Sequence, residues 1–212
     1  MMSLKARANR TATALFGALG VAVAGYGGAA MAQQQGDQPP QGWFKACTKQ
    51  EEVDVCNVQF LRRAGTGQLV TSVNLIEVEG KVNRRVLQIA VPTGRLIPPG
   101  IGLQIDGGST QKIDYAVCVP DRCVAEAQLN DEIVSSFKRG SELTLTSVNF
   151  QNQPNPVNIT LQGFTDAYDG EPLQQDDLDD RQRKLEEYVN KNTEEFADRL
   201  RQAQERAKQD SE

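Results

Sequence analysis

Short stretches in which apolar and polar residues alternate dominate the chain between residues 43 and 164. The alternation is clearest where Val157, Ile159 and Leu161 face one way and the residues between them are polar. A period of two residues is that of a β-strand with one buried and one solvated face. Eight such stretches predict an all-β fold, an antiparallel β-sandwich or barrel-like domain; they span 43–48, 53–63, 68–78, 81–91, 101–105, 113–119, 143–150 and 157–164.

One short helix is predicted to interrupt this pattern between residues 130 and 140. Asn130 is a favourable N-cap, Gly140 a favourable terminator, and Ile133, Val134 and Phe137 recur on one face. The segment also has acidic residues in its first turn and basic residues in its last, as the helix dipole favours.

The apolar period becomes helical beyond Pro172, where no glycine or proline follows. Acidic residues come first and basic residues last, which again suits a helix dipole. We therefore predict a C-terminal amphipathic α-helical tail, helical from about 174 to 208. Asn192 interrupts its thin apolar stripe, which consists of Leu185, Val189, Phe196 and Leu200. This apolar stripe could pack on the β-domain, on a second copy of the chain or on another partner.

The first 32 residues have the three parts of a secretory signal peptide. Three basic residues within the first ten precede an apolar run over 12–24 and the small-residue triplet Ala30-Met31-Ala32. A membrane anchor is the competing interpretation, but a spanning helix needs about 20 predominantly apolar residues and this run is shorter. We predict cleavage between Ala32 and Gln33, which leaves a mature chain with no transmembrane segment.

The mature chain divides into three parts. Residues 33–42 contain Gln, Gly and Pro without periodicity, which is typical of a disordered leader. Residues 43–168 carry the strand pattern and are predicted to form one β-domain. Residues 169–212 begin with a Gly- and Pro-containing stretch and form the acidic helical tail.

All four cysteines lie in the predicted exported part, and their even number favours disulfides. Four cysteines allow three pairings. We favour Cys47 with Cys56 and Cys118 with Cys123 because each pair is close in sequence, although sequence alone does not choose. A four-cysteine zinc site is the alternative, but the first gap is wider than usual ligand spacing and the chain has no histidine.

Charge and composition narrow the function classes. Loss of three basic residues with the signal would change the net charge from -5 to -8, and the excess acid lies in the tail. That balance disfavours nucleic acid and anionic lipid as partners. The absence of histidine excludes Ser-His-Asp and Cys-His nucleophile systems. We predict no catalytic, cofactor-binding or metal-binding residues, and no enzyme activity.

An ordered series of residues and short motifs runs through residues 43–168. Its members are Trp43, Cys47, Cys56, Val91-Pro92-Thr93-Gly94, Pro99-Gly100, Ile105-Asp106-Gly107, Tyr115-Ala116-Val117-Cys118, Cys123, Gly140, Leu161-Gln162-Gly163-Phe164 and Ala167. This series resembles the invasion-associated locus B family of α-proteobacterial exported proteins. The chain departs from the family pattern at Pro120-Asp121-Arg122, where a glycine is expected before the second cysteine of the pair, and in its long helical tail.

The resemblance implies a periplasmic, outer-membrane-associated or secreted protein, and a role in host-cell adhesion or invasion by analogy with the founding member. The leading hypothesis is therefore an exported, non-catalytic interaction protein of the envelope or cell surface. It has a protein partner, and self-association through the C-terminal helix is one arrangement of that contact. The alternative is a housekeeping periplasmic binding, inhibitor or chaperone-like factor, and a hydrolase is the least supported interpretation.

Overall fold

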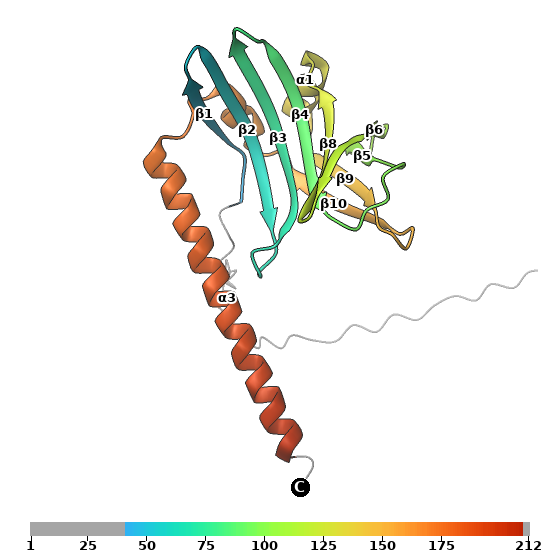
Figure 1. Cartoon of the computed structure of the whole chain (residues 1–212), viewed down its shortest axis with the longest axis vertical. Coiled ribbons are helices and arrows are strands. Elements are labelled where there is room, and N and C mark those ends of the chain that lie inside the picture. Colours follow the sequence, from blue (N-terminus) through green and yellow to red (C-terminus); the bar gives the residue numbers. More distant parts are fainter. Residues whose placement is uncertain (1–40, 210–212) are drawn as a thin grey trace, which may run out of the picture. The chain divides into compact units, whose positions relative to one another are not determined.

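The computed structural model describes residues 41–209, which form ten strands and three helices (Figure 1). The predicted signal peptide and almost all of the predicted leader lie outside the described residues. In chain order the elements are β1 Phe44–Gln50, β2 Val53–Arg63, β3 Leu69–Gly80, β4 Arg84–Pro92, β5 Ile101–Ile105, β6 Gln111–Ile113, β7 Tyr115–Val119, β8 Arg122–Gln128, α1 Asp131–Arg139, β9 Glu142–Val148, β10 Pro154–Thr160, α2 Phe164–Asp169 and α3 Gln175–Gln209.

Six of the strands form one antiparallel sheet in the order β1-β2-β3-β4-β8-β7. Its first four strands follow one another as hairpins, and β8 returns to lie beside β4 (Figure 1). The period-two pattern places alternate side chains on one face, where they are buried. The buried residues of β2, β3 and β4 on this face include Val58, Phe60, Val73, Leu75, Leu87 and Ile89.

The other four strands form a second antiparallel sheet in the order β10-β9-β5-β6. Its buried side chains, among them Leu143, Leu145 and Ile159, belong to the same hydrophobic cluster as those of the first sheet. The prediction of an all-β antiparallel fold is thus confirmed, with one core shared by two sheets. Each of the eight predicted stretches overlaps a strand.

An aromatic cluster closes the core beside the two short helices. The indole of Trp43 lies 5.4 Å from the Phe60 ring and 4.9 Å from the Phe164 ring, measured between centroids. Phe137 of α1 lies 5.3 Å from Phe164 of α2. The indole Nε1 donates a hydrogen bond to the carbonyl of Thr160 at 2.8 Å, so the buried polar atom of the tryptophan is satisfied.

The predicted helix at 130–140 is confirmed as α1. The side chain of Asn130 accepts a hydrogen bond from the Ile133 N–H at 2.9 Å, and Gly140 follows the last turn. The long C-terminal helix is also present, as α3.

A second short helix, α2, stands where the sequence pattern predicted the end of a strand. Gly163 adopts φ +80°, a left-handed conformation that ends extended structure, and the Phe164 N–H closes a turn onto the Leu161 carbonyl at 3.0 Å. This turn brings the Phe164 ring into the core, where it is fully buried. The expectation of only one short helix was therefore wrong.

The stretch predicted as one strand over 113–119 is divided between the two sheets. Ile113 pairs with Ile101 in the second sheet, whereas Tyr115 pairs with Ala125 in the first. Beyond a bulge in β7 the apolar side chains leave the core, so that Val117 and Val119 are 50% and 38% exposed. Strand β8 was not predicted, because its buried residues are small and include Cys123 and Ala125.

Candidate interaction surface

The first half of α3 packs one face against the β-domain. Its half-buried residues recur at intervals of three and four positions, the spacing of one helix face, whereas the residues between them are mostly exposed. The apolar or partly apolar members of this face are Leu178, Arg181, Leu185, Tyr188 and Val189.

Two places on the β-domain hold this face. The Arg181 guanidinium lies over the Phe44 ring of β1, 4.2 Å from its centroid, and burial lowers the pKa of that guanidinium. In the turn between β2 and β3, Gly67 lies against Val189, whose nearest methyl carbon would be 3.1 Å from a Cβ at the glycine. Gly65 lies similarly beside Asn192. The Asn192 side chain also donates to the Tyr188 carbonyl at 2.7 Å, so this polar residue in the apolar stripe has a partner.

The second half of α3 differs, because every residue over 193–209 is exposed. We call this part the distal segment. Phe196 and Leu200, the last two members of the apolar stripe, are 57% and 48% exposed. The apolar stripe predicted from the sequence is thus divided in the structure, with Leu185 and Val189 half-buried and its other two members on the surface.

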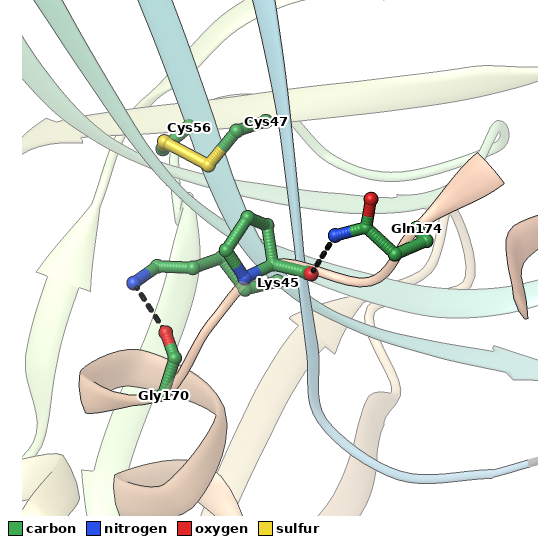
Figure 2. The surroundings of a disulfide bond; sticks show 6 residues. Lys45, Cys47, Cys56, Gly170 and Gln174 are labelled. Atoms are coloured by element: carbon green, nitrogen blue, oxygen red, sulfur yellow. Dashed lines mark hydrogen bonds between the residues drawn. A yellow bond between two sulfur atoms is a disulfide. The ribbon is translucent and has the colours of Figure 1, made fainter.

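The disulfide between Cys47 and Cys56 lies where the segment between α2 and α3 crosses β1. Figure 2 shows the Lys45 side chain extending from β1 to the Gly170 carbonyl, which it reaches at 3.0 Å. The Leu173 N–H also donates to the Lys45 carbonyl at 2.8 Å. The two cysteines oppose each other in the β1–β2 register, and their bond links β2 to β1, the strand to which this segment is attached.

The second disulfide joins Cys118 and Cys123, which oppose each other across the β7–β8 hairpin. It secures the edge strand of the six-stranded sheet to its neighbour. The structure therefore joins the same two pairs that sequence proximity favoured, and the reason is visible in the register, since each pair is directly opposite across a hairpin.

A polar network ties both short helices to the six-stranded sheet. Arg85 of β4 donates to Glu77 at 2.9 Å, to Asp131 of α1 at 2.7 Å and to Tyr168 of α2 at 3.2 Å. The Tyr168 hydroxyl in turn donates to Glu77 at 2.6 Å. Burial, and after it the hydrogen bond to Glu77, raises the pKa of Tyr168 to about 12. The pKa of Arg85 is also raised, and the largest cause is the hydrogen bond of Arg85 to Asp131.

No sequence pattern predicted this network, because its members follow no motif and the outermost two, Glu77 and Tyr168, are 91 positions apart. The contacts of Gly65 and Gly67 with α3 were not predicted either, since glycines between two predicted strands indicate only a turn. No local signal distinguishes a turn glycine that faces a helix from one that faces solvent.

The predicted cleavage site, Ala32 and Gln33, lies outside the described residues. Between residues 41 and 209 there is no group of three or more acidic or cysteine side chains placed to hold a metal ion. None of the three helices in that range combines the length and apolar character of a membrane-spanning segment.

Two antiparallel sheets around one core, two hairpin disulfides and an appended helix together define a class of disulfide-linked β-proteins. The family model "Invasion associated locus B (IalB) protein" matches residues 43–172, which is more than half of the chain. The chain therefore belongs to the invasion-associated locus B family, which is named for invasion and not for a catalysed reaction. Helix α3 begins beyond the matched residues.

Individual relatives agree with this assignment. Invasion protein B homologs of Brucella abortus strain 2308 and of Brucella abortus biovar 1 strain 9-941 are each 30% identical over 132 residues, which is 61% of this chain and 75% of each relative. The crystal structure of invasion associated protein B from Bartonella henselae superposes with a TM-score of 0.51 at 21% identity, over 60% of this chain and 90% of that one. This last likeness concerns the fold.

Proposed function

We propose that the chain is an exported, non-catalytic interaction protein of the bacterial envelope or cell surface, with a part in attachment to or invasion of host cells. Membership of the invasion-associated locus B family and the names of the Brucella relatives support an invasion-associated role. The two disulfides support an oxidising compartment, as does the signal pattern before Gln33.

We place the binding surface on the distal segment of α3. Phe196 and Leu200 are four positions apart, so they lie one turn apart on the same side of the helix. Two large apolar side chains at this spacing on an otherwise charged helix suit the apolar groove of a protein partner, which would bury both of them. The docked first half of α3 joins this segment to the β-domain and limits the entropy lost when a partner binds.

Binding of the purified, labelled protein to envelope membranes and to host cells tests this function. We expect the double variant Phe196→Ser and Leu200→Ser to bind at least about tenfold more weakly than the unaltered protein, because one buried large apolar side chain contributes roughly 1.5–3 kcal/mol. The matched control replaces Glu194 and Glu205 by serine; both residues are exposed and face away from Phe196.

The control should bind as the unaltered protein does. Equal binding by both double variants would remove the distal segment from the contact. Binding to the bacterium's own envelope but not to host cells would favour the housekeeping function instead. Absence of the protein from the envelope and secreted fractions would contradict the proposal of export.

A further inference from the structure

A cavity of about 370 Å³ lies between the two sheets, beside the turn that joins β2 to β3. The first sheet contributes residues from the ends of β3 and β4, and the second contributes β9 and β10. Its volume is near the lower end of the range for cavities that bind small molecules. The walls are largely apolar and include Leu69, Val70, Val91, Leu145, Pro156 and Val157.

Among the described residues that line this cavity, Arg95 alone is charged, and none is an aspartate or glutamate. The Nε atom of Arg95 is buried and has no hydrogen-bond partner among the described residues. Arg85 of β4 shows the usual arrangement, since Glu77 and Asp131 both pair with it. A guanidinium nitrogen removed from water without an acceptor costs free energy, and a bound anion would offset that cost.

A second buried polar atom without a described partner, the hydroxyl oxygen of Tyr115, lies in the field of Arg95. Burial raises the pKa of Tyr115, and the positive charge of Arg95 acts in the opposite direction. The charge of the guanidinium thus acts on this hydroxyl, and neither the Nε atom of Arg95 nor the hydroxyl oxygen of Tyr115 has a hydrogen-bond partner among the described residues.

Another cavity, of about 600 Å³ between α1 and β5, lacks this imbalance. Its lining contains Asp106 and Glu132 as well as Arg139, and the Asp106 carboxylate accepts hydrogen bonds from the backbone N–H groups of Ser141 and Glu142 at 2.8–3.1 Å. Its charges are thus of both signs, and that carboxylate already has partners within the fold.

We propose that the cavity beside the β2–β3 turn binds a small aliphatic monocarboxylate, whose carboxylate pairs with Arg95 and whose hydrocarbon body lies against Leu69, Val91 and Val157. The single cation selects an anionic head, since a planar guanidinium matches the two oxygens of a carboxylate. The apolar walls select a hydrocarbon body over a hydrophilic one, because burial of apolar surface favours binding.

Octanoate is the probe, with 1-octanol as its uncharged counterpart and inorganic phosphate as an anion without a hydrocarbon body. Titration of the purified, disulfide-bonded protein is followed by calorimetry and by amide chemical shifts. We expect saturable octanoate binding that shifts the amides of Leu145 and Val157, and at least about tenfold weaker binding of 1-octanol and of phosphate.

Three variants locate the binding site. Arg95→Leu should weaken octanoate binding at least about tenfold, and Arg95→Lys, which keeps the charge but not the planar fork, should be intermediate. The control Arg84→Leu removes an arginine that lies on another part of the surface, paired with Glu126, and should bind octanoate normally.

The proposal is overturned if octanoate does not bind, if 1-octanol or phosphate binds as tightly as octanoate, or if Arg95→Leu binds octanoate as tightly as the unaltered protein. The comparison of octanoate with 1-octanol uses the unaltered protein, so it decides the role of charge even if a variant fails to fold.

Discussion

Replacement of Gly67 by alanine is expected to push α3 away from the β-domain. Gly67 has φ +81°, and a Cβ there would stand 3.1 Å and 3.3 Å from the two methyl carbons of Val189. Carbon atoms this close repel one another, so either the valine must move or the helix must leave the β2–β3 turn. The substitution thus adds a clash with α3 to the strain of a left-handed alanine.

The two contributions have different magnitudes and different dependence on α3. A residue with a Cβ in the left-handed region costs about 1–2 kcal/mol whether or not the helix is present. Overpacking costs roughly 1–3 kcal/mol, but only while Val189 occupies its site. We expect the clash to cost about 1 kcal/mol, at the low end of that range, because a half-exposed helix can shift more easily than a core.

Urea unfolding of two chains separates these contributions. Gly67→Ala should cost about 2–3 kcal/mol in the full chain and only about 1–2 kcal/mol in a chain that ends at Gln174 and lacks α3. Gly107→Ala is the matched control, because Gly107 has φ +70° and no atom within 4 Å of a Cβ there. Its cost should be the same in both chains.

A difference smaller than about 0.5 kcal/mol between the two chains for Gly67→Ala would contradict the contact between α3 and the β2–β3 turn, since that is the ordinary scatter of additive effects. In that case α3 would not be held against the β2–β3 turn in solution, and the apolar stripe would be available along its whole length.

Three further predictions concern the core, the polar network and export. Phe164→Ala should lower the free energy of unfolding by about 3–5 kcal/mol and the melting temperature by roughly 10 °C, because the ring is fully buried. The control Phe150→Ala changes a side chain that is 70% exposed and should alter the free energy of unfolding by less than about 0.5 kcal/mol. Calorimetry of both variants and the unaltered protein measures these effects. The fold favours the protonated form of Tyr168, whose pKa rises from 10.0 to about 12. The stability that the protonated hydroxyl adds to the fold is therefore present below pH 10 and is lost as the pH rises to about 12. That contribution is about 1 kcal/mol after allowance for solvent exposure, and the difference in urea stability between the protein and Tyr168→Phe should shrink by this amount across the same pH range. The intact mass of protein from the envelope fraction should correspond to a chain that begins at Gln33, and a mass that includes the apolar run over 12–24 would contradict the predicted cleavage.

Local pattern predicted much of this fold because the signals that govern it act over a few residues. Alternation placed Val157 and Ile159 in a strand, and the capping pattern around Asn130 located α1 to within one residue at each end. The preferred disulfide pairs also follow from local structure, since a hairpin brings Cys47 opposite Cys56 without help from the rest of the chain. Composition alone excluded Ser-His-Asp and Cys-His nucleophile systems, because the chain has no histidine.

The amino-acid sequence alone is enough to specify the alternating strands, the short helix capped at Asn130 and the long charged helix, because each depends on backbone preference and on neighbours a few residues away. The packing of the whole fold specifies which half of the apolar stripe is covered, that β8 inserts beside β4, and that Arg95 faces a cavity without a carboxylate among its described lining residues. These features depend on contacts between residues far apart in the chain, such as Val189 with Gly67. Such contacts follow from how the two sheets and α3 pack, and side-chain period alone does not specify which surfaces meet.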